Sequence, residues 1–289
     1  MAEREHDVAL RVPGMASNVL HLAGRELRDA VRSRWFVLYT LAFVVLGLGV
    51  SYMSAAAAGG TGLSGFSRTT AGLINLVILV VPLMALSAGA GSIASDRERG
   101  MLAYLLSQPT TRMELLLGKF VGLGAVLLSS VCAGFGVCAA ILAWKGSSSG
   151  PATLVWLVAL TFLLSLGMLA TGLAISVCAR RSAAAQGIAI FAWLTLVFVS
   201  DLGIMAGAVA MRMRIETLFA LCTANPMQSF KMWALLNADT TLDVLGPAGL
   251  YASDTLGDRA AWLFAGVLVA WVVVPLGIAA RLFSWRAVA

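Results

Sequence analysis

Long apolar runs are the feature of this sequence that most limits its fold. Of its 289 residues, 60% are hydrophobic and only 12% are charged, about half the charged share of an average soluble domain. A run of about 20 apolar residues can cross a bilayer as a helix. The sequence therefore predicts an all-α polytopic membrane protein with six transmembrane helices, near residues 35–58, 70–93, 113–144, 153–178, 183–210 and 260–283.

The lysines and arginines are shared unevenly between the segments that connect these spans. If the N-terminus is inside the cell, 14 of them lie on the inner side and 6 on the outer side. Because positive residues concentrate in cytoplasmic loops, this distribution predicts that both termini are cytoplasmic. The net charge of +6 reflects this topology, so it does not indicate a nucleic-acid partner.

The chain before the first span has two parts. Residues 1–13 are polar and are expected to be disordered. Residues 14–34 alternate apolar residues such as Leu20 and Leu27 with arginines such as Arg25. A basic amphipathic helix of this kind lies in the headgroup layer of the lipid bilayer, although a helix solvated in the cytosol would show the same pattern. We therefore expect an interfacial helix at 14–34, and a short cytoplasmic C-terminus at 284–289.

A short charged segment, residues 95–119, separates the second and third spans on the cytoplasmic side. Pro109 lies in its second half and cannot continue a helix, because it has no N–H group. Before Pro109, four apolar residues fall on one face of a short helix: Met101, Leu102, Leu105 and Leu106. The pattern predicts a short amphipathic helix on the cytoplasmic surface, shaped to be held by a partner protein.

Two capping boxes flank this helix. Ser95 is followed three residues later by Glu98, and Thr111 by Glu114. In such a pair the hydroxyl accepts a hydrogen bond from a free backbone N–H, and the glutamate bonds back to the N–H of the cap residue. We therefore expect one helix to begin after Ser95 and another after Thr111.

The longest connection, residues 211–259, lies on the outer side. Asn225 and Pro226 divide two stretches that can form helices, around 214–221 and 227–236. Loops of this length without structure of their own are uncommon. We therefore expect an extracytoplasmic helical subdomain between the fifth and sixth spans.

Sulfur-containing side chains gather near this connection. Thioether and thiol groups are ligands that Cu(I) prefers, but methionine is also a common packing residue in apolar helices. We favour packing and predict that this chain binds no metal. The residues concerned are Met205, Met211, Met213, Cys222, Met227 and Met232.

No motif of catalysis or nucleotide binding is present. The two histidines, His6 and His21, both precede the first span. Gly118-Lys119 lacks the upstream glycine and the following Ser or Thr of a phosphate-binding loop. The sequence therefore predicts a protein that is not an enzyme and binds no cofactor.

Ionisable residues within the predicted spans are few. Asp201 is an ionisable residue in the fifth span, where a functional role and a structural hydrogen bond are equally open. Gly118 and Gly122 open the third span, and Gly203 and Gly207 have the same spacing in the fifth. This spacing permits close helix approach, and the second pair is a candidate dimer contact.

The charged segment resembles the cytoplasmic signature of ABC-2-type transporter permeases. The similarity extends over about residues 20–286 and includes the amphipathic entry, the six spans and the long outer connection. Met101 departs from the pattern, which has a small hydroxyl residue there, so the contact at this position is expected to be more apolar. The signature residues are Glu98, Gly100, Leu105, Leu106, Pro109, Arg112, Gly118 and Lys119. Within the family, the chain is most similar to permeases of nitrous oxide reductase maturation.

This resemblance implies a homodimer in the bacterial inner membrane, each subunit docked on a separate cytoplasmic ATPase that binds ATP and Mg²⁺. It implies a periplasmic partner on residues 211–259 and a role in copper or sulfur delivery. The alternative is an ABC-2 exporter of a lipid, polysaccharide or drug. The residues that the resemblance assigns to ATPase coupling are Arg97, Glu98, Gly100, Leu102, Leu105, Leu106, Pro109 and Arg112.

Overall fold

The chain folds into α-helices in the computed structural model, which describes residues 15–57, 63–107, 110–144, 151–209, 215–237 and 259–285. No strand occurs in these residues, so the all-α prediction is confirmed for them. The helices are α1 (Met15–Arg32), α2 (Arg34–Ala57), α3 (Leu63–Glu98), α4 (Met101–Leu106), α5 (Arg112–Trp144), α6 (Pro151–Cys178), α7 (Ser182–Val209), α8 (Ile215–Ala224), α9 (Pro226–Asn237) and α11 (Arg259–Trp285).

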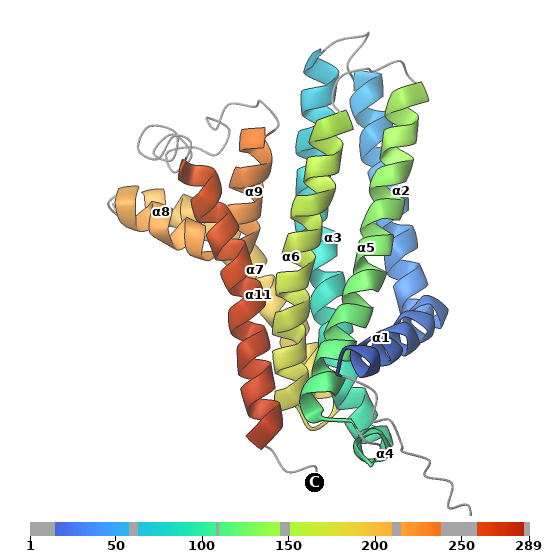
Figure 1. Cartoon of the computed structure of the whole chain (residues 1–289). Coiled ribbons are helices and arrows are strands. Elements are labelled where there is room, and N and C mark those ends of the chain that lie inside the picture. Colours follow the sequence, from blue (N-terminus) through green and yellow to red (C-terminus); the bar gives the residue numbers. More distant parts are fainter. Residues whose placement is uncertain are drawn as a thin grey trace, which may run out of the picture.

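The long helices form a bundle. In Figure 1, α1 lies across the lower end of this bundle, and α4 lies below it at the same end. Helices α8 and α9 lie toward the opposite end, beside α11. We call the end that carries α1 and α4 the α4 end.

Four helices within the described residues are long and apolar enough to cross a membrane. They cover Ala71–Glu98, Arg112–Ala140, Ala152–Cys178 and Arg259–Trp285. Shorter apolar stretches, Phe36–Val50 in α2 and Ser182–Phe198 in α7, coincide with the predicted first and fifth spans. Four spans are thus supported by length and composition, and the count of six stays a prediction.

Helices α3 and α6 form the most extensive contact in the bundle. Two glycines meet where they cross: a Cβ on Gly172 would lie 2.5 Å from the carbonyl oxygen of Leu86, and one on Gly89 would lie 2.6 Å from that of Leu169. The Ser176 hydroxyl of α6 accepts hydrogen bonds from the N–H groups of Ile93 and Ala94 of α3, at 3.0 and 2.8 Å. Backbones therefore touch directly here, as small residues permit in membrane helices.

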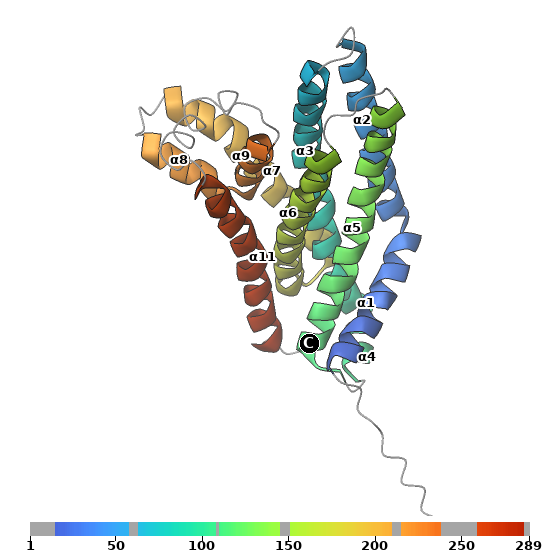
Figure 2. The same cartoon turned by 45° about the horizontal axis from the view of Figure 1, so that its top comes forward.

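The two stretches of the outer connection that were predicted to be helical are α8 and α9. Helix α9 is not a surface helix, because most of its side chains are buried against α6 and α11. Trp233 of α9 packs edge-to-face on Trp156 of α6, with ring centroids 5.6 Å apart. The Trp271 indole of α11 donates to the carbonyl oxygen of Ala224, 3.0 Å away, at the end of α8. Figure 2 shows both helices grouped beside α11.

The contact of α3 with α6 should fail when a methyl group is added to it. We expect Gly172→Ala to destabilise the protein by about 1–3 kcal/mol, because the added carbon overlaps backbone atoms. Gly277→Ala in α11 is the matched control, because its Cβ would meet nothing within 4 Å. Melting temperatures of the purified variants in detergent measure the effect. Equal melting temperatures for the two variants would contradict the close approach.

Candidate functional site

The turn between α3 and α4 depends on one glycine. Gly100 has φ = 72°, in the left-handed region, and its N–H donates to the carbonyl oxygen of Arg97 at 3.1 Å. Residues with a Cβ adopt this conformation at a cost of about 1–2 kcal/mol. The predicted capping box at Ser95 is wrong: Ser95 lies inside α3, and its carbonyl oxygen accepts the N–H of Arg99. Helix α3 therefore continues through Asp96 and Arg97, ends at Glu98, and is followed by the turn at Gly100.

Helix α4 has one buried face and one exposed face. Leu102 and Leu105 are 1% and 4% exposed and pack into the core of the protein, and Leu106 is half-buried. Tyr104 is 61% exposed, and Met101, one turn earlier, is exposed as well. The prediction of an amphipathic helix is confirmed, except that Met101 lies on the exposed side. The leucines therefore hold α4 in place, while Tyr104 and Met101 are available for contact with another molecule.

The start of α5 has the capping box that the sequence predicts. The N–H of Thr111 donates to Glu114 Oε2 at 2.8 Å, and the N–H of Glu114 donates to Thr111 Oγ1 at 3.2 Å. The same carboxylate oxygen accepts from the Asn18 side-chain amide of α1 at 3.4 Å. Pro109, which was predicted to end the preceding helix, lies outside the described residues.

The charged residues beside α4 bond to the ends of other helices. Arg97 donates to the carbonyl oxygens of Val177 and Ala179, at the end of α6. Glu98 accepts the N–H of Ser182 at 3.1 Å, at the start of α7. Arg112 donates to the carbonyl oxygens of Phe283 and Ser284 at 3.0 and 3.1 Å, near the end of α11. Cations bound to C-terminal carbonyls and an anion bound at an N-terminus stabilise helix ends, so these residues tie the α4 segment to α6, α7 and α11.

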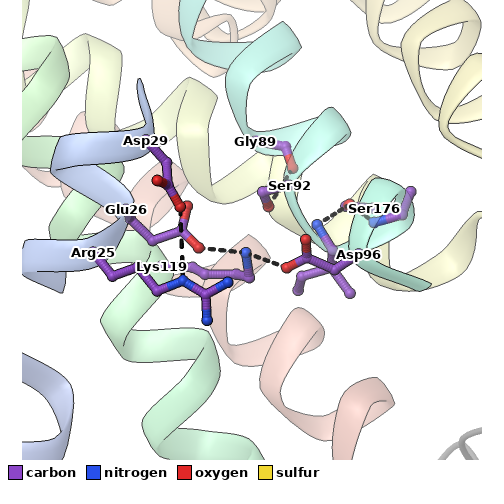
Figure 3. Close-up of polar contacts among 10 residues, drawn as sticks. Arg25, Glu26, Asp29, Gly89, Ser92, Asp96, Lys119 and Ser176 are labelled. Atoms are coloured by element: carbon purple, nitrogen blue, oxygen red, sulfur yellow. Dashed lines mark hydrogen bonds and ion pairs between the residues drawn. The ribbon is translucent and has the colours of Figure 1, made fainter. Parts of the chain in front are cut away.

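A buried lysine joins three helices at the α4 end. The Lys119 ammonium of α5 is 2% exposed and lies 2.6 Å from Glu26 Oε1 of α1 and 2.7 Å from Asp96 Oδ2 of α3. Figure 3 shows Lys119 between the two carboxylates. A buried ammonium needs such partners, because removing a charge from water costs several kcal/mol. We call these three residues the Lys119 triad.

Two glycines explain why α1 comes so close to α5. A Cβ on Gly118 would lie 2.6 Å from Leu22 Cβ, and one on Gly122 would lie 2.7 Å from Glu26 Cβ. The close approach expected from this glycine pair is confirmed, and the neighbouring helix is α1. Sequence reasoning missed the Lys119 triad. The available signal was a lysine beside a GxxxG glycine in an apolar run, which requires a nearby acid.

Other residues singled out in the sequence can be placed only in part. Asp201, Gly203 and Gly207 lie on the last turns of α7, and their side-chain surroundings, together with Met211 and Met213, are outside the described residues. Cys222, Met227 and Met232 are buried among the helices. Burial raises the pKa of the Cys222 thiol to about 11, so it remains protonated at neutral pH.

Removing the Lys119 charge should destabilise the protein. We expect Lys119→Met to cost about 3 kcal/mol, because Glu26 and Asp96 would lose their shared cation. Lys119→Arg keeps the charge and should cost less. Arg180→Met, which removes an exposed charge at the same end, should be within about 0.5 kcal/mol of the wild type. Thermal unfolding in detergent provides the comparison, and a Lys119→Met protein as stable as the wild type would contradict a structural role for the triad.

Comparison with known proteins identifies the family. The sequence pattern of the ABC-2 family transporter protein matches residues 20–287. The chain is 31% identical to "Probable ABC transporter permease protein NosY" of Stutzerimonas stutzeri over 276 residues, which cover 93% of this chain and 99% of that protein. It is 32% identical over 272 residues to the protein of the same name from Pseudomonas aeruginosa, covering 92% of this chain and 97% of that protein. The chain therefore belongs to the ABC-2 family of ABC transporter permeases.

Proposed function

We propose that this chain couples ATP hydrolysis by a separate cytoplasmic ATPase to a conformational change across the membrane. The ATPase, which carries ATP and Mg²⁺, would bind at α4. The observation that carries the proposal is the construction of α4: it is anchored by two buried leucines and presents Tyr104 and Met101 outward. A helix that is packed against the protein on one face and exposed on the other is suited to receive a force from a docked protein.

The bonds around α4 provide a route for that force. Helices α3 and α5 flank α4 in the chain, so a displacement of α4 acts on both directly. Arg97 and Glu98 extend the connection to α6 and α7, and Arg112 extends it to α11. Because helices are stiff along their axes, movement at the α4 end would reach α8 and α9 at the opposite end. A contiguous set of packed elements of this kind can carry coupling between distant sites.

The assembly that fits this mechanism is a homodimer of six-span subunits in the bacterial inner membrane, with both termini in the cytoplasm. Gly203 and Gly207 in α7 are candidate dimer contacts, and Asp201, two residues before Gly203, is an intramembrane polar residue with a functional role or a structural hydrogen bond. The 211–259 segment would bind a periplasmic partner. The similarity to NosY permeases supports a role in nitrous oxide reductase maturation. In this role the chain signals across the membrane during copper or sulfur delivery, or transports the substrate itself.

Substitution of Tyr104 tests the docking surface. We expect Tyr104→Arg to abolish co-purification of an ATP-binding subunit from the native host, because a charge would replace the exposed aromatic contact. Tyr104→Phe, which keeps the ring, should retain it. Mass spectrometry of proteins pulled down in mild detergent is the readout. Equal ATPase recovery with both variants would place the docking site elsewhere, and absence of an ATPase from the wild-type sample would overturn the proposed function.

The orientation can be tested with a native cysteine. Cys178 is exposed at the end of α6, next to the carbonyls that Arg97 binds. We expect a membrane-impermeant maleimide to label it in inverted vesicles and not in intact spheroplasts, with Cys178→Ser as the control. Cys222 should react poorly from either side, since it is buried and its pKa is raised to about 11. Labelling of Cys178 in spheroplasts would reverse the proposed topology.

A further inference from the structure

The side chains of α1 that the structure describes form three different faces, and one of these faces packs against the rest of the protein. The first face packs on α5, where Leu22 and Ala23 meet the two glycines and Glu26 reaches Lys119. Asn18, one turn earlier, is buried on the same side and bonds to Glu114. The described residues on the other two faces are exposed.

The second face of α1 is an apolar stripe. Leu20, Gly24, Leu27 and Val31 follow the spacing i, i+4, i+7 and i+11, which places them in one row along a helix. All four are exposed, and Leu20 is exposed to 67%. Two residues beyond α1, helix α2 begins and also exposes a row of apolar residues: Val37, Leu38, Leu41 and Val45.

The third face is basic. His21, Arg25, Arg28 and Arg32 have the same spacing as the apolar stripe and are displaced from it by one residue, or about 100° around the helix. All four are exposed. Asp29 lies 3.7 Å from Arg25, which leaves a net positive charge on this face.

An anionic phospholipid surface matches these two faces together. Apolar side chains can enter the boundary of the acyl chains while neighbouring arginines bind headgroup phosphates. The apolar stripe is followed directly by the exposed apolar row of α2, a helix that contains a candidate span, so both rows suit the same bilayer. Charge complementarity thus selects an anionic bilayer surface as the occupant.

The contacts of α1 reach both sides of α4. Through Lys119, Glu26 is linked to Asp96, which lies on α3 just before the turn into α4. Through Asn18, α1 is linked to Glu114 in the capping box of α5, just after α4. A shift of α1 would move Glu26 relative to Lys119 and change how strongly the lysine holds Asp96. In a site shielded from water, such a change of charge pairing has a large effect on the energy that holds Asp96 to Lys119.

We propose that α1 binds anionic phospholipid through Arg25, Arg28 and Arg32, and that the Lys119 triad transmits this binding to the α4 segment. Anionic lipid in the leaflet at the α4 end then orders α4 and thereby regulates the docking of a partner protein on this helix. That α4 is where an ATPase docks rests on the proposed function; the lipid response of α1 and α4 does not.

Hydrogen–deuterium exchange of the purified full chain tests the proposal without any ATPase. The chain is placed in nanodiscs of phosphatidylcholine alone, or of phosphatidylcholine and phosphatidylglycerol in equal amounts. We expect phosphatidylglycerol to slow exchange several-fold in both α1 and α4. The double variant Arg28→Gln/Arg32→Gln should lose the response, because each arginine removed lowers the affinity for an anionic surface about fivefold. Arg180→Gln/Arg181→Gln removes two exposed charges at the same end, outside α1, and should keep it.

Two further variants test transmission through the triad. Glu26→Gln should leave the response of α1 to phosphatidylglycerol in place and remove that of α4. Asp96→Asn breaks the same link from the α3 side and should have the same effect, so the test stands if either variant folds poorly. The proposal is overturned if α1 exchanges equally in both lipids, or if α4 still responds in both variants. It is also overturned if the Arg180/Arg181 control loses the response as fully as the α1 double variant.

Discussion

The buried ammonium of Lys119 is the interaction on which the α4 end of the protein depends. A charge that is 2% exposed must be compensated nearby, and Glu26 and Asp96 do this from two different helices. Because Lys119 needs both carboxylates, it fixes where α1 crosses α5 and where the apolar part of α3 ends. Because breaking such a contact would leave carboxylates without their cation, α1, α3 and α5 are held in one relative arrangement. The α4 segment is connected to this arrangement through α3 and α5, which flank it in the chain.

Close backbone contact is the second constraint, and it makes the first possible. Gly118 and Gly122 allow α1 to lie directly on α5, which brings Glu26 within reach of Lys119. Gly89 and Gly172 do the same for α3 and α6 in the bundle. Since lipid tails are as apolar as leucine side chains, helices in a bilayer gain from such tight packing and from hydrogen bonds more than from hydrophobic burial. The polar bonds of Arg97, Glu98 and Arg112 then connect the remaining helix ends to α4.

Much of the fold could be predicted from hydropathy. The local capping signals on either side of α4 gave one correct and one wrong prediction. The apolar runs agree with the helices to within a few residues, except that α3 begins at Leu63 and extends to Glu98. The capping box predicted at Thr111 is present in the structure, and the one predicted at Ser95 is not. At Thr111 the chain enters a helix from a non-helical residue, so its hydroxyl can cap; at Ser95 the helix is already formed. A capping motif shows which residues are able to cap a helix. Whether they do so depends on whether the backbone before them is non-helical.

The sequence by itself determined the helical class, the approximate helix bounds and the amphipathic character of α1 and α4, because each depends on residues close together in the chain. Tertiary structure decided which face of α1 meets α5, that Lys119 is shared by Glu26 and Asp96, and that Arg97 and Arg112 bond to the ends of α6 and α11. These pairings join residues from about 20 to more than 170 positions apart. A charged side chain in the sequence shows that a partner is needed; only the packing of helices shows which partner is within reach.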